Sequence, residues 1–169
     1  ASDLEHGQQV AISVAEARRS VILAGPDLQI IEQPVPGGVI RAAALGDAAA
    51  AAKAAQSAAP LLAAHRAFWR DEGGPFFVAV GAADRPVERG DAVALPTAWG
   101  PELEAAVTRT WLPGRTGSDG PAWLVEGLPD LFAVRIALRA GLIAPDAAVG
   151  RLAAFDRPGD PAARGALLA

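Results

Sequence analysis

The chain has 169 residues, a net charge of −4, no cysteine and 51% hydrophobic residues. This length and apolar content are enough for one domain with a core, and they exclude disorder as the overall state. The lack of cysteine excludes disulfides, thiolate nucleophiles and cysteine-based metal sites. Because the 15 basic residues are scattered rather than clustered, we expect no nucleic-acid partner.

The sequence predicts no membrane span. Its longest apolar stretch, residues 48–64, is mostly alanine and contains Lys53, Gln56, Ser57 and Pro60. The chain also lacks the basic-then-apolar start of a signal peptide, but a signal peptide is removed on export. The compartment is therefore not predicted.

The first 45 residues indicate a strand-rich part. Turn signals at Gly25-Pro26 and at 34–37 separate short runs with strand character. The predicted strands are Gln9 to Val14, Ser20 to Ala24, Leu28 to Glu32, and Gly38 to Ala43.

An alanine-rich segment then predicts one long helix from Asp47 to about Arg70, since alanine is the strongest helix former and aspartate favours the position before the first turn. Pro60 marks a point where this helix can bend. Two further strands are predicted at Phe76 to Gly81 and at Asp91 to Leu95, joined by a polar linker.

The last part of the chain predicts consecutive helices. One runs from Pro101 to about Trp111, one from Ser118 to Ala140 with Gly141 as its stop, and one from Pro145 to before Pro158. Strands followed by consecutive helices are typical of an α+β fold rather than of alternating βαβ units. We expect a single domain over 1–157, strand-rich over 1–45 and helix-rich over 46–157, with a flexible tail at 158–169.

Two blocks near the end resemble a known family. The segment 122–132, Ala-Trp-Leu-Val-Glu-Gly-Leu-Pro-Asp-Leu-Phe, is followed by Ala-Leu-Arg-Ala-Gly-Leu-Ile at 137–143. Together they resemble the second zinc-ligand helix of glycyl aminopeptidase-like proteins of the M61 peptidase family. Upstream, 111–115 reads Trp-Leu-Pro-Gly-Arg and is similar to the segment that follows that family's HExxH helix. The resemblance implies a thermolysin-like gluzincin fold, with a small, mostly antiparallel sheet and several packed helices.

The same resemblance implies that the zinc-binding motif has been lost. In HExxH, two histidines one helical turn apart bind zinc and the glutamate acts as general base. The histidine positions correspond to Ala105 and Arg109, and the glutamate position corresponds to Ala106. A methyl group cannot bind metal or accept a proton, and arginine brings a permanent positive charge. We therefore expect no zinc and no other cofactor.

The resemblance assigns Glu126 to the family's third zinc ligand and matches Asp130, one turn later, to an aspartate of the family pattern. Two carboxylates without imidazoles rarely hold zinc, so we assign them no metal. One hypothesis is that Arg109 pairs with Glu126, so that a guanidinium replaces the metal charge. Pro129 is expected to kink this helix near Val125.

These observations favour a catalytically inactive peptidase-like domain that is a structural or peptide- or protein-binding module. Trp111, Trp123 and Glu126 are candidate cleft residues, although tryptophans beside apolar helices also pack in cores. An alternative is a hydrolase with different chemistry that uses Glu126 and Asp130 as acid and base. A third reading is a subunit or interdomain contact, and the oligomeric state is not predicted. His65 is expected at the surface or its boundary.

Overall fold

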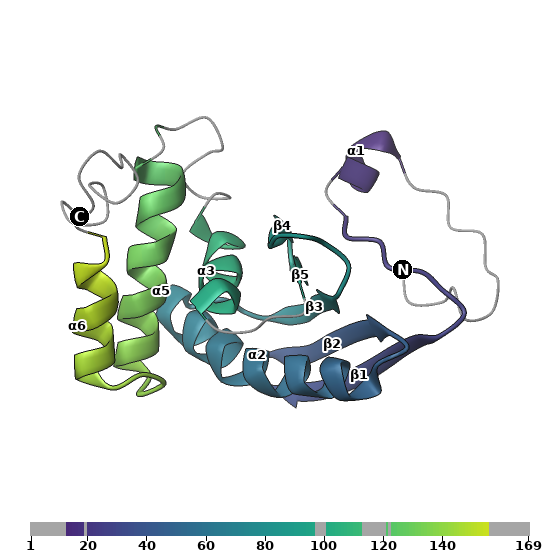
Figure 1. Cartoon of the computed structure of the whole chain (residues 1–169), viewed down its shortest axis with the longest axis horizontal. Helices are drawn as coiled ribbons and strands as arrows, with labels where there is room; N and C mark the ends of the chain where they lie inside the picture. Colours follow the sequence, from purple (N-terminus) through teal and green to yellow (C-terminus); the bar gives the residue numbers. More distant parts are fainter. Residues whose placement is uncertain (1–12, 19, 97–100, 113–120, 122, 156–169) are drawn as a thin grey trace.

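The computed structural model describes residues 13–18, 20–96, 101–112, 121 and 123–155. These residues form an α+β fold in which a five-stranded sheet lies beside a long helix, and further helices follow at one end of that helix (Figure 1). The α+β class predicted from the sequence is confirmed. The tail predicted at 158–169 lies outside the described residues.

The sheet is mixed rather than mostly antiparallel, so that part of the prediction is wrong. Its strands are β1 (Leu28–Val35), β2 (Gly38–Leu45), β3 (Gly74–Val80), β4 (Val87–Arg89) and β5 (Ala92–Leu95). Their order is β1-β2-β3-β5-β4. The β1/β2 and β4/β5 pairs are antiparallel, whereas β2/β3 and β3/β5 are parallel. The long helix between β2 and β3 returns the chain to the end of the sheet at which β2 begins, so β3 runs parallel to β2.

Two predicted assignments change at the edges of this sheet, and a third is only partly described. Residues Ser20 to Ala24 are extended but are not a strand, and Val14–Arg18 forms a short helix, α1. The first predicted strand, Gln9 to Val14, lies mostly outside the described residues. The linker predicted at 82–90 contains β4, whose three residues pair with β5.

Helix α2 (Ala48–Trp69) is the long helix that the sequence predicted. The Asp47 carboxylate accepts a hydrogen bond from the Ala50 N–H at 2.8 Å and caps its start. Its buried face consists largely of alanines, and these small side chains allow a close approach to the sheet. The buried residues of the sheet in the same core cluster alternate along β2 and β3, and are Ile40, Ala42, Ala44, Phe76, Val78 and Val80. One face of the sheet is thus covered by α2.

The remaining helices are α3 (Pro101–Arg109), α5 (Leu128–Arg139) and α6 (Pro145–Ala153), with a π-helical segment, η2 (Trp123–Gly127), directly before α5. Pro129 lies in the first turn of α5, where proline is tolerated, and not inside a continuous helix, so the kink expected near Val125 stays a prediction. Gly141, at φ +71°, follows the end of α5 as predicted. Among the described residues, no helix is long and apolar enough to cross a membrane.

Candidate functional site

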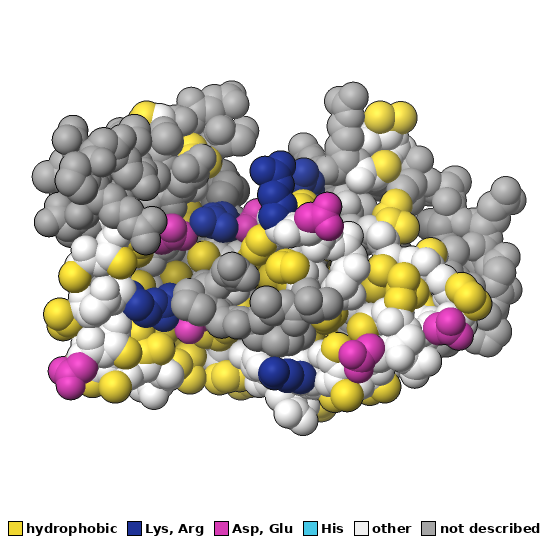
Figure 2. Space-filling view, in the orientation of Figure 1, with side chains coloured by type: hydrophobic (Ala, Val, Ile, Leu, Met, Phe, Trp, Pro, Cys, Tyr) yellow, Lys and Arg dark blue, Asp and Glu magenta, His cyan; other side chains and the backbone are white. Residues whose placement is uncertain are grey.

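Arg109, the last residue of α3, lies between carboxylates from two other elements. Its Nη2 is 2.9 Å from Asp130 Oδ1 on α5, and its Nη1 is 3.2 Å from Glu88 Oε1 on β4. The Arg109 side chain is 28% exposed, so the cluster is partly shielded from water. Figure 2 shows basic and acidic side chains side by side over the region of α5, α3 and β4. One cation and two carboxylates therefore link three elements that are distant in the sequence.

The neighbouring positions of α3 do not fit a zinc ion. Ala105 and Ala106 present methyl groups only, and Ala106 is fully buried in the core beside Val107. Arg109 adds a positive charge, which repels a dication. Among the described residues, no group of three or more His, Asp or Glu side chains is placed to hold a metal ion.

The structure gives Asp130 a definite partner. One of its carboxylate oxygens accepts a hydrogen bond from the Arg109 guanidinium, so Asp130 contributes to charge neutralisation. Glu126 lies in η2, and its side chain is outside the described part of the structure, so the hypothesis of an Arg109–Glu126 pair stays untested. Glu88 was not predicted as a site residue, because β4 is too short to show a strand pattern within a polar segment.

His65 is buried in α2 and only 1% exposed, so its predicted position at the surface or its boundary is wrong. Its Nδ1 accepts a hydrogen bond from the Trp69 indole N–H at 3.2 Å. The Thr108 hydroxyl donates to the Glu104 carbonyl and lies 3.1 Å from His65 Nε2. The Thr108 oxygen must then accept from Nε2–H, which fixes the neutral Nε2–H tautomer. Burial lowers the pKa of His65 from 6.5 to about 4.

Trp111 belongs to the same buried cluster. Its ring stacks on His65 with centroids 5.0 Å apart, and its indole N–H donates to Asp71 Oδ2 at 2.8 Å. Trp111 therefore packs in the core, which is the alternative to the cleft role considered from the sequence. The Trp123 side chain is outside the described part of the structure.

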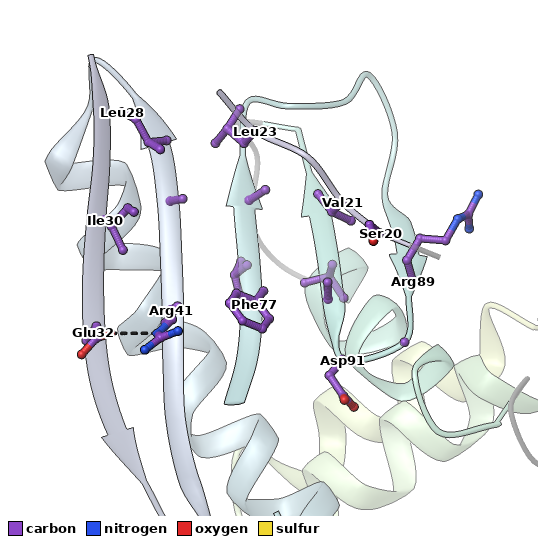
Figure 3. A pocket seen from close by; sticks show the side chains of 16 residues that line it. Ser20, Val21, Leu23, Leu28, Ile30, Glu32, Arg41, Phe77, Arg89 and Asp91 are labelled. Carbon is purple, nitrogen blue, oxygen red and sulfur yellow. Dashed lines mark hydrogen bonds and ion pairs between the residues drawn. The ribbon is translucent and has the colours of Figure 1, made fainter. Parts of the chain in front are cut away.

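A cavity of about 690 Å³ lies on the face of the sheet opposite α2. Figure 3 shows its floor of strand residues and the extended segment Ser20 to Leu23 that crosses above them. The walls are mostly apolar, with Glu32 and Arg41 on the side of β1 and β2, and Arg89 and Asp91 on the side of β4 and β5. Neither this cavity nor the crossing segment was predicted from the sequence, because the segment was assigned to the sheet itself.

Comparisons with known proteins support only the fold. No protein-family model matches the chain, and no match was found among curated proteins. One similar solved structure is an aminopeptidase N family protein from Idiomarina loihiensis, with 14% sequence identity and a TM-score of 0.53. The similarity covers 75% of this chain but only 28% of that protein. The chain is therefore distantly similar in fold to part of a much longer protein.

Proposed function

We propose that this chain is a peptidase-like domain without zinc peptidase chemistry, and that it acts as a structural or peptide- or protein-binding module. The observation that carries the proposal is the ion-pair cluster of Arg109 with Glu88 and Asp130. The resemblance to the M61 family, counted back from Trp111 in the 111–115 block, implies that Arg109 stands at the position of a zinc-binding histidine. A guanidinium held by two carboxylates supplies positive charge at that position without a Lewis acid.

The fold gives this proposal independent support. The distant structural similarity is to an aminopeptidase N family protein, which is compatible with a gluzincin-like, thermolysin-like arrangement. The gluzincin-like arrangement requires α3 and α5 to pack together. The ion pair between Arg109 and Asp130 joins these two helices. The alternative hydrolase that uses Glu126 and Asp130 is less favoured, since the Asp130 carboxylate already neutralises the Arg109 guanidinium.

The first test is the zinc content of protein purified without chelator, together with hydrolysis of fluorogenic aminopeptidase substrates. We expect substoichiometric zinc and no hydrolysis above that of denatured protein. Stoichiometric zinc, or hydrolysis that a chelator abolishes, would refute the proposal. Hydrolysis that is insensitive to chelator but lost in Asp130→Asn would favour the alternative hydrolase instead.

A second test asks whether α3 occupies the position of a metal-site helix. The double variant Ala105→His/Arg109→His places two imidazoles one helical turn apart, near the Asp130 carboxylate. We expect this variant to bind zinc in a competition assay, whereas the matched single variant Ala105→His binds much more weakly. Equal zinc binding by the two variants would mean that the assigned motif position on α3 is wrong.

A further inference from the structure

We propose that the open face of the sheet, opposite α2, is a docking groove for an extended aliphatic peptide segment of a partner protein. This deepens the binding role proposed above and rests on it, but it uses other residues. Glu88 and Arg89 are consecutive on β4: Glu88 contacts Arg109, whereas Arg89 lines the cavity on the open face. The groove and the ion-pair cluster are therefore separate features.

The chain's own segment shows how such a peptide would lie. Val21 and Leu23 line the cavity, whereas Ile22 between them is 64% exposed (Figure 3). This alternation is that of an extended chain, in which successive side chains point to opposite sides. The open face thus already accommodates an aliphatic side chain at every second residue, and a cavity of about 690 Å³ remains between this segment and the strands.

The floor of the remaining space is suited to further aliphatic side chains. Ile30 on β1 and Phe77 on β3 are 38% and 36% exposed there, and Ala43 on β2 leaves room between them. Ala43 pairs with Ile30 across the two strands, so both lie on one face. Covering Ile30 and Phe77 would remove apolar surface from water, which favours association.

The charged side chains that line the cavity favour a peptide over a small organic ion. Arg41 donates a hydrogen bond to the Glu32 carboxylate at 2.8 Å, and its guanidinium lies 6.0 Å from the centre of the Phe77 ring. Arg89 and Asp91 also line this space, so two cations are balanced by two anions. Such a mixture does not select an ion of one charge, but it offers donors and acceptors to the C=O and N–H groups of an extended backbone.

Fluorescence anisotropy with the full chain tests this inference. The probe is a fluorescein-labelled peptide, Lys-Ser-Val-Ser-Leu-Ser-Ile-Ser-Lys, and the matched control peptide has the same composition with its three aliphatic residues adjacent. We expect saturable binding of the alternating peptide and at least about fivefold weaker binding of the control, because only an alternating segment presents all three side chains to one face.

Three variants locate the binding site. Phe77→Glu adds a charge to the floor, and Ala43→Leu fills the space without adding charge. Each should weaken binding at least about tenfold, since burial of a charge and loss of volume both oppose docking. Val149→Glu, at a 65% exposed position on α6, is the matched control and should bind as the unmodified chain does. Circular dichroism verifies that each variant is folded, and Ala43→Leu keeps the test decisive if Phe77→Glu does not fold.

The inference is overturned if the alternating peptide shows no saturable binding, if both peptides bind equally, or if Ala43→Leu binds normally. Binding of dodecanoate without binding of the peptide would also overturn it, by assigning the cavity to small amphipathic molecules. The zinc measurement is independent of these outcomes. A chain that holds no zinc and binds no peptide would contradict only the docking groove. A chain that holds zinc and binds the peptide would contradict only the proposed lack of zinc chemistry.

Discussion

Acidification from pH 7 to pH 5 should destabilise this protein through His65. The side chain is buried, and burial lowers its folded-state pKa to about 4 from the ordinary value of 6.5, which we take for the unfolded chain. Between these two values the unfolded chain binds more protons than the folded one, so the free energy of unfolding falls as the pH falls. Proton linkage with these values gives a loss of about 2 kcal/mol between pH 7 and 5, rising to roughly 3 kcal/mol below pH 4.

The geometry supplies the physical reason. Protonation of Nδ1 would turn it into a donor facing the Trp69 indole N–H, so the hydrogen bond would be lost and two donors would oppose each other. Urea unfolding followed by tryptophan fluorescence at pH 7, 6 and 5 measures the effect. His65→Gln is the control, because glutamine does not titrate. If the unmodified chain loses no more stability than His65→Gln over this range, the assignment of the neutral, buried His65 is refuted.

Two further predictions concern stability at pH 7, measured by urea unfolding. Arg109→Met should lower the free energy of unfolding by about 1–2 kcal/mol, because two partly shielded carboxylates lose their cation. Arg41→Met, at the more exposed ion pair with Glu32, should lower it by less than about 1 kcal/mol. A larger loss in Arg41→Met than in Arg109→Met would contradict the importance of the Arg109 cluster. Gly73→Ala should cost at least about 2 kcal/mol, because its Cβ would fall 2.0 Å from the Gly37 carbonyl oxygen at φ +105°. Gly46→Ala, at φ +67° with no atom within 4 Å, should cost only about 1 kcal/mol, and equal losses would exclude the steric cause.

The sequence predicted elements whose signals are local. Asp47 before an alanine-rich run located the start of α2, and the compact apolar run at 76–81 located β3. Strand direction was not predictable in this way, because parallel pairing of β2 and β3 depends on where α2 returns the chain. The segment Ser20 to Ala24 has strand-forming residues, but tertiary packing places it across a face of the sheet instead of along an edge.

The candidate site was predicted in part for similar reasons. Arg109 and Asp130 lie in motif-like segments, so the sequence singled them out, but nothing indicated that they contact each other. Glu88 lies in a polar segment without periodicity and gave no signal. His65 was misplaced because an alanine-rich helix barely distinguishes its buried face from its exposed face. Trp69 could have indicated that His65 is buried, because it lies one turn later on the same side of α2.

The alanine-lined contact between α2 and the sheet constrains how this protein can change during evolution. Ala51, Ala54, Ala55 and Ala58 are fully buried there, and only glycine is smaller. In an ordinary core many harmful substitutions remove side-chain atoms and leave cavities. Here the harmful substitutions are enlargements, since an added methyl group must push the helix away from the strands along its whole length. Substitutions at this contact are therefore limited by the available volume more than by hydrophobicity. Valine, although more apolar than alanine, should be too large for these positions, whereas serine, which is close to alanine in size, should be tolerated.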